Sequence, residues 1–190
     1  SFFKSNNPHV KTFSRIRGCI GEPTTIFFLT FFGVYGTLHL KQTISRVGMT
    51  MTEHIPVLVD EVLEGLQSQN GGVFLDCTTG CGGHAAAILS QHPENRLVGI
   101  DRDAQALQIA QKRLEPFGDR VCLVHTRFEE FEQVLQEIHQ QEGFDGILLD
   151  LGVSSLQLDR GERGFSFQYP ARLDMRMNQQ DSRTAYDVVN

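Results

Sequence analysis

The chain has 190 residues, a formal net charge of −6 and 40% hydrophobic residues. This length is enough for one sizeable domain and the start of another, and the apolar content excludes disorder for most of the chain. The acidic balance gives no electrostatic sign of a nucleic-acid-binding protein. The spacing of the four cysteines is not that of a disulfide framework, which favours a reducing compartment.

Residues 1–50 differ in composition from the rest of the chain, because they hold six Lys or Arg residues and one acidic residue, Glu22. Residues 51–150 hold six basic and seventeen acidic residues. The apolar stretch 26–40 is interrupted by glycine and is shorter than the roughly 20 residues that a membrane-spanning helix needs. We interpret residues 1–50 as a leader or a non-native upstream segment, with a targeting segment as the alternative, and leave them out of the expected fold.

From residue 51 the pattern alternates between short apolar runs and amphipathic stretches. We expect helices at 56–66, 85–91, 103–114 and 128–138, and strands at 73–77, 97–101, 121–124 and 144–150. Strands that are apolar throughout and alternate with helices indicate a parallel sheet covered on both faces. The sequence therefore predicts a doubly wound, Rossmann-like α/β fold, which binds its ligand at the carboxyl ends of the strands.

A glycine-rich turn follows the first expected strand and opens the next helix. Gly80 and Gly82 allow a sharp bend and a close approach to a nucleotide-type cofactor, and Asp101, nineteen residues beyond Gly82, can accept hydrogen bonds from ribose hydroxyls. This spacing also fits the fingerprint of a dinucleotide-binding oxidoreductase. Asp76, at the end of the strand, suits a cationic methyl donor better than a pyrophosphate, so we favour the methyl donor and keep NAD as the alternative.

Cys77, Cys81 and His84 lie close enough in sequence to suggest a zinc cluster. A tetrahedral zinc site needs a fourth ligand, which usually comes from a second Cys or His pair. We therefore expect two incidental thiols and no metal.

Asp150 and Ser154 lie at the carboxyl end of the fourth expected strand. Groups that accept the N–H bonds of an exocyclic amine would increase the electron density on its nitrogen and align it with a methyl donor. These two residues are the candidate catalytic groups. The alternative, that Asp150 caps a turn and Ser154 is solvated, stays open from the sequence.

The residues from His54 to Asn190, about seven-tenths of the chain, resemble the RsmH (MraW) family of 16S ribosomal RNA cytosine N4-methyltransferases. The landmarks are His54-Ile-Pro-Val-Leu, Asp76-x-Thr-x-Gly-x-Gly-Gly-His84, Gly99-Ile-Asp-Arg-Asp103, Asp145-Gly-Ile-Leu-Leu-Asp-Leu-Gly-Val-Ser-Ser155, Gln157-Leu-Asp159, Glu162-Arg-Gly-Phe-Ser-Phe167 and Leu173-Asp-Met-Arg-Met177. The last four landmarks together fit no dehydrogenase pattern.

This resemblance implies a class I methyltransferase that transfers a methyl group from S-adenosyl-L-methionine to N4 of a cytosine in 16S ribosomal RNA, with no metal. It also implies the cofactor contacts. These are Gly82, Gly83 and His84 along the methionine part, Asp101 at the ribose, Phe128 near the adenine, and Asp150 and Gln157 completing the pocket. An inactive fragment remains a further alternative, beside the oxidoreductase.

The resemblance divides the chain into an incomplete cofactor-binding core at 51–155 and the start of an inserted helical substrate domain at 156–190. Two interpretations stay open for the charged and aromatic residues of that second part. Arg160, Arg163, Arg172 and Arg176 either contact RNA phosphates or pair with neighbouring acids, and Phe165 and Phe167 either stack on a base or form core.

The expected partner is 16S ribosomal RNA in the small subunit, without a membrane, and a homodimer is left open. The expected location is the bacterial cytoplasm. If residues 1–50 are a transit segment, a plastid or mitochondrion is the alternative.

Overall fold

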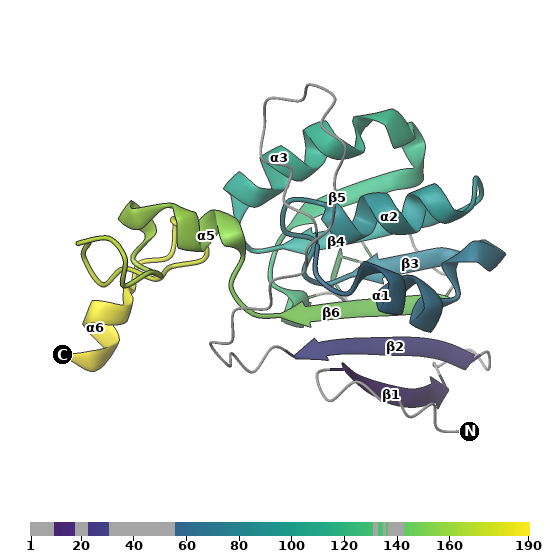
Figure 1. Ribbon diagram of the computed structural model, residues 1–190, viewed down its shortest axis with the longest axis horizontal. Coiled ribbons are helices and arrows are strands. Elements are labelled where there is room, and N and C mark those ends of the chain that lie inside the picture. Colours follow the sequence, from purple (N-terminus) through teal and green to yellow (C-terminus); the bar gives the residue numbers. More distant parts are fainter. Residues whose placement is uncertain (1–9, 18–22, 31–55, 131–132, 135, 137–142) are drawn as a thin grey trace, which may run out of the picture.

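The computed structural model describes residues 10–17, 23–30, 56–130, 133–134, 136 and 143–190. Its centre is a six-stranded sheet with the order β1-β2-β6-β3-β4-β5 (Figure 1). The four strands expected from the sequence are present as β3 (Val73–Asp76), β4 (Arg96–Asp101), β5 (Val121–His125) and β6 (Gly146–Leu151). Each pairs in parallel with its neighbour, so the predicted α/β fold with a parallel sheet is confirmed.

Three helices lie close to where the sequence predicts them, one before β3 and two that connect β3 to β4 and β4 to β5. They are α1 (Val59–Leu66), α2 (Gly83–Gln91) and α3 (Ala104–Leu114). The helix α3 begins where it does because the Asp103 side chain accepts hydrogen bonds from the backbone N–H groups of Gln105 and Ala106, which have no partner within the helix. The helix expected at 128–138 begins as the 3₁₀ turn η3 (Phe128–Glu130), and most of its remainder lies outside the described residues.

Successive residues of β3 and β4 point to opposite faces of the sheet and enter different clusters of buried side chains. Phe74 and Leu97 belong to the cluster that also holds residues of α1, α2 and α3. Leu75 and Val98 belong to the cluster on the other face, with Val134 and Phe144. Both faces of the sheet are therefore covered, which explains why these strands are apolar throughout.

The first fifty residues, which are not part of the expected fold, contribute two strands to the sheet. The strands β1 (Val10–Arg17) and β2 (Pro23–Thr30) form an antiparallel pair, and β2 runs parallel to β6 from Thr25 to Thr30. An apolar strand that can satisfy the N–H and C=O groups along the edge of β6 gains hydrogen bonds that periodicity within the segment does not reveal. Whether this segment is also a leader stays a prediction.

After β6 the chain leaves the sheet and lies beyond the carboxyl ends of the parallel strands (Figure 1). It forms α5 (Ser155–Asp159), the 3₁₀ turn η4 (Gly161–Arg163) and α6 (Ala185–Val189). Phe167 is fully exposed here, so it does not contribute to the core of the described part of the chain. None of the described helices is long and apolar enough to cross a membrane.

Candidate functional site

Three carboxylates meet at the carboxyl edge of the sheet, each at or near the end of a different strand. Asp76 ends β3, Asp101 ends β4 and Asp150 is the penultimate residue of β6. Parallel strands bring their carboxyl ends to one edge, and Asp101 and Asp150 lie near enough to Asp76 to raise its pKa by charge repulsion. The edge therefore has a concentrated negative charge that favours a cationic ligand.

Asp76 is the most deeply buried of the three, with 1% of its surface exposed. Its Oδ1 accepts a hydrogen bond of 3.0 Å from the backbone N–H of Thr78, while its Oδ2 is buried with no hydrogen-bond partner among the described residues. Burial is the main reason that the pKa of Asp76 is raised to about 7, with Asp101 and Asp150 adding to it. A buried acceptor of this kind is stabilised by a donor or a cation.

The glycine-rich turn orients Asp101. Gly80, with a φ of 54°, donates its backbone N–H to Asp101 Oδ2 at 2.7 Å, and Asp103 donates its own to Asp101 Oδ1 at 2.8 Å. Each carboxylate oxygen has a further lone pair for a ligand hydroxyl. Burial raises the pKa of Asp101, and these backbone donors oppose that shift.

The segment before α1 packs against the glycine-rich turn and the start of α2. A Cβ atom at Gly83 would collide with the Pro56 ring, so a glycine is required there for close packing. His84 is buried, and its Nε2 lies 3.0 Å from the backbone carbonyl oxygen of Val57. A carbonyl only accepts, so the Nε2–H group donates to it, while Nδ1 faces Asp150 Oδ2 at 3.9 Å.

Asp150 is held in place through the turn as well. Its backbone N–H donates to Thr78 Oγ1 at 2.7 Å, which ties the end of β6 to the loop after β3. Burial raises the pKa of Asp150, while His84 lowers it. The pair thus presents one carboxylate and one ring nitrogen toward the same space.

Ser154 and Gln157 lie just after β6 and interact with each other. The Ser154 hydroxyl accepts the backbone N–H of Gln157, and the Gln157 side chain accepts the backbone N–H of Ser154, which is a capping box at the start of α5. Gln157 Nε2 also donates to Asp103 Oδ2 at 3.2 Å. Both residues therefore have structural partners, and their predicted roles in catalysis and cofactor binding stay predictions.

Phe128 is the first residue of η3, the element that follows β5, and 37% of its surface is exposed. An exposed ring at this edge is suited to contact with a flat base. The structure thus brings together Gly82, Gly83, His84, Asp101 and Asp150 around one turn. It places Phe128 at the start of η3 and Gln157 within α5.

Two residues hold the site together in roles that sequence reasoning did not assign to them, Thr78 and Arg163. The contact between Thr78 and Asp76 was partly predictable, because an Asp side chain that accepts a hydrogen bond from the backbone two residues later is typical of an Asx turn. Arg163 is buried and donates from its terminal nitrogen to Asp103 Oδ2 at 2.8 Å. The interpretation of Arg163 as an RNA contact is therefore wrong, and its partner is not a neighbouring acid but Asp103, the N-cap of α3.

The other arginines of this segment also have internal partners. Arg176 donates to Asp174 at 2.7 Å and lowers the pKa of that carboxyl. Arg160 donates to Gln105 Oε1 at 3.2 Å, and the Arg172 guanidinium lies over the Tyr186 ring. These contacts favour the structural interpretation of the three residues.

In the described part of the chain, no three His, Cys, Asp or Glu side chains are arranged to hold a metal ion. Burial raises the pKa of Cys77 to about 12, which opposes formation of the thiolate that zinc binds.

The sequence profile of the MraW methylase family matches residues 51–190. Two similar proteins, both called Ribosomal RNA small subunit methyltransferase H, come from Geobacter sp. (strain M21) and Picosynechococcus sp. (strain ATCC 27264 / PCC 7002 / PR-6). They are 52% and 50% identical to this chain over 138 residues, covering 72% and 73% of it. The chain spans less than half of each relative, 44% and 46% of their lengths.

Among solved structures, an RNA methyltransferase from Salinibacter ruber in complex with S-adenosyl-L-homocysteine is 22% identical, with a TM-score of 0.37. The match covers 45% of this chain and 67% of that one. The match of the family profile over residues 51–190, which includes the whole carboxylate edge, shows that this chain belongs to the MraW methylase family.

Proposed function

We propose that the protein transfers a methyl group from S-adenosyl-L-methionine to N4 of a cytosine in 16S ribosomal RNA. The observation that carries the proposal is the family match over residues 51–190, which contains the three carboxylates at one edge of the sheet. The names of the relatives, Ribosomal RNA small subunit methyltransferase H, support the ribosomal substrate.

The residues at this edge fit the proposed cofactor by charge. S-adenosyl-L-methionine carries a sulfonium and an ammonium group, and when bound it supplies an electrophilic methyl group. Asp76 has a buried oxygen without a partner among the described residues, which suits a cationic group. Asp101 is oriented by two backbone N–H groups to accept the ribose hydroxyls, and Gly82, Gly83 and His84 would lie along the methionine part.

The proposed acceptor is a weak nucleophile, because the lone pair of N4 is delocalised into the cytosine ring. Asp150 would accept an N–H of this amine, which increases electron density on the nitrogen and fixes its direction. The nitrogen loses a proton as the new bond forms, and a carboxylate facing His84 Nδ1 is suited to take it. In this proposal no metal and no covalent enzyme intermediate take part.

The dinucleotide alternative is not favoured. The family match supports a methyltransferase over an oxidoreductase, and the geometry agrees. A pyrophosphate against this turn would meet Asp76, Asp101 and Asp150, whose negative charges already repel one another.

The test is an incubation of the full-length protein with labelled S-adenosyl-L-methionine and small ribosomal subunits from cells that lack the modification. The RNA is then digested and the labelled nucleoside identified. Label in N4-methylcytidine is the expected result. Label in another nucleoside would keep the methyl transfer but contradict the target, and absence of label in every nucleoside would contradict the proposal.

We also propose that the protein acts in the bacterial cytoplasm on the small subunit. Localisation in a plastid or mitochondrion, with residues 1–50 removed on import, is the alternative. Fractionation of tagged protein, followed by determination of its N-terminal residue, separates the two.

A further inference from the structure

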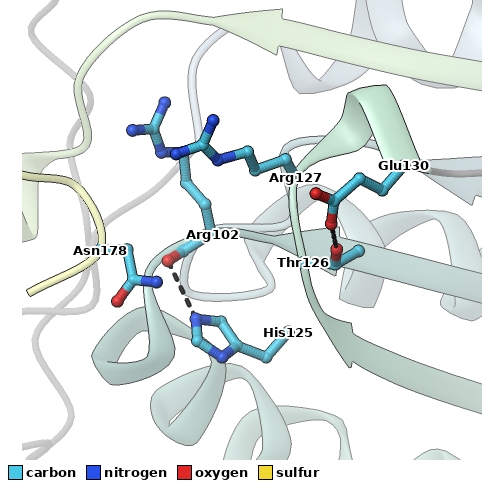
Figure 2. A pocket seen from close by; sticks show the side chains of 6 residues that line it. All are labelled: Arg102, His125, Thr126, Arg127, Glu130 and Asn178. Atoms are coloured by element: carbon cyan, nitrogen blue, oxygen red, sulfur yellow. Dashed lines mark hydrogen bonds between the residues drawn. The ribbon is translucent and has the colours of Figure 1, made fainter. Parts of the chain in front are cut away.

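A second site lies next to the carboxylate edge, at the ends of β4 and β5. It is a pocket of about 210 Å³ lined by Arg102, His125, Thr126, Arg127, Glu130 and Asn178 (Figure 2). Five of these residues belong to the sheet edge and the turn after β5, while Asn178 comes from the segment after α5. The pocket therefore lies between the core and residues 156–190, which is a common place for a ligand site.

Two guanidinium groups lie beside each other in this pocket (Figure 2). Asp181 joins them, with its Oδ2 3.5 Å from Arg102 and its Oδ1 3.7 Å from Arg127. Both distances are longer than the roughly 2.7–2.9 Å of a charge-assisted hydrogen bond. In addition, Arg102 Nε is buried with no hydrogen-bond partner among the described residues. The two arginines thus have donors that this carboxylate does not satisfy.

The loop that carries Asp181 is fixed to the rest of the segment. Arg176 donates to the Asp181 carbonyl oxygen at 2.8 Å, and Arg163 donates to the carbonyl oxygens of Arg176 and Met177. The Asp181 backbone is therefore held at the mouth of the pocket. Its short side chain can still turn away, because its two ion pairs are long and its surface is 27% exposed.

Three of the other polar side chains in the pocket, those of His125, Thr126 and Glu130, have partners within it (Figure 2). The Thr126 hydroxyl donates to Glu130 Oε2, and His125 Nε2 donates to the Arg102 carbonyl oxygen at 3.0 Å. Glu130 is thereby engaged on the wall, and Asn178 contributes an amide. With Asp181 turned away, the side chains that remain to receive a ligand are mainly cationic.

These features fit an oxyanion with more acceptor oxygens than a carboxylate, bound by two guanidinium forks. S-adenosyl-L-methionine contains no phosphate, so the proposed cofactor does not supply this oxyanion. We propose that this pocket binds a backbone phosphate of the RNA substrate, and that Asp181 pairs with Arg102 and Arg127 until the RNA displaces it. This inference rests on the proposed function, since it takes RNA as the substrate.

Direct RNA binding tests the site separately from methyl transfer. The full-length protein is titrated with a labelled 16S fragment between about 50 and 200 mM salt. Arg127→Gln should weaken binding about tenfold and reduce the salt slope by about one. Arg127→Lys keeps the charge but loses the two-pronged guanidinium group, so its affinity for RNA should lie between those of the wild type and Arg127→Gln. Arg183→Gln is the matched control, because Arg183 is exposed in the same segment. An equal loss in this control would overturn the proposal.

Asp181→Asn gives the opposite and more diagnostic result. It removes the competing charge while keeping the side-chain shape, so RNA should bind about threefold or more tightly. If Asp181 serves only to hold the segment in place, this variant will bind RNA no better, which would contradict the proposal.

Cofactor binding distinguishes the remaining occupants of the pocket. The affinity of Arg127→Gln for S-adenosyl-L-homocysteine should equal that of the wild type. A loss would assign the pocket to the adenine of the cofactor and overturn the inference, as would tight NADP binding that depends on Arg127. If RNA binds as expected but no methyl group is transferred, the proposed reaction fails while the phosphate site stands.

Discussion

At the scale of single residues, Asp76 combines complete burial with an unsatisfied oxygen. Its folded-state pKa of about 7 lies above the ordinary 3.8, so the folded protein holds this proton more tightly than the unfolded chain does. The stability associated with the protonated form is therefore complete below pH 3.8 and is lost as pH rises through about 7.

Asp76→Asn should stabilise the cofactor-free protein by about 1–3 kcal/mol at pH 8, because it removes the cost of ionising a buried carboxyl. The gain should shrink toward pH 4, and urea unfolding at the two pH values measures it. The same variant should weaken the binding of S-adenosyl-L-methionine more than that of S-adenosyl-L-homocysteine, whose sulfur carries no charge.

The control for this variant is Asp119→Asn, at an exposed position in the turn before β5. It should change stability by less than about 0.5 kcal/mol at either pH. Equal stability of Asp76→Asn and wild type at pH 8 would show that ionisation of Asp76 does not destabilise the folded protein.

Asp150→Asn should lower turnover about 100-fold or more, because the amide is a poorer proton acceptor than the carboxylate. Affinity for S-adenosyl-L-homocysteine, measured by calorimetry, should change much less. Turnover close to that of the wild type would remove Asp150 from the proposed chemistry.

Ser154 lies four residues after Asp150, and a variant at this position distinguishes a role in catalysis from a role in helix capping. Its hydroxyl accepts from the backbone N–H of Gln157, so Ser154→Ala should cost about 1 kcal/mol of stability and keep most of the turnover. Thermal unfolding and the labelled-methyl assay measure the two effects. A stable variant with strongly reduced turnover would restore Ser154 as a catalytic group.

At the scale of elements, the N-terminus of α3 is where the core and the following segment join. Asp103 caps the helix with Oδ1 and binds Arg163 and Gln157 with Oδ2. The cap was predictable, because Asp before an amphipathic run is a local signal. The ion pair was not, since Arg163 lies sixty residues further along the chain and has nearer acids in sequence.

Arg163→Ala should destabilise the protein by about 3–5 kcal/mol, because it leaves the Asp103 carboxylate buried without its cation. Urea unfolding measures the loss. Arg163→Met combined with Asp103→Asn should recover much of it, since Asn still caps α3 and the charge is gone. Arg183→Ala, at an exposed position, is the control. If Arg163→Ala and Arg183→Ala cost the same, the buried pair does not anchor the segment.

At the scale of the whole molecule, β1 and β2 extend the sheet beyond β6. The β6 backbone pairs with β2 from Gly146 to Leu151, and an unpaired parallel edge invites association with another chain. The family match begins only at residue 51, so β1 and β2 lie outside it.

Removal of residues 1–50 should expose this edge and lead to self-association, measured by light scattering on a size-exclusion column. The free energy of unfolding should also fall by about 1 kcal/mol or more, since a strand pair is lost. A monomer of unchanged stability would show that these residues contribute nothing to the sheet, as expected of a leader.

The sequence by itself determined the order of the four parallel strands along the chain, the helices α1 to α3 and the glycine-rich turn, because hydrophobic periodicity and capping are local signals. It also placed Asp76, Asp101 and Asp150 at strand ends, and so at one edge. Only the tertiary structure decided that Arg163 pairs with Asp103, that β2 covers β6, and that Asp181 joins Arg102 to Arg127. Each of these contacts joins residues distant in sequence, and their partners are selected by packing and burial, which no local pattern encodes.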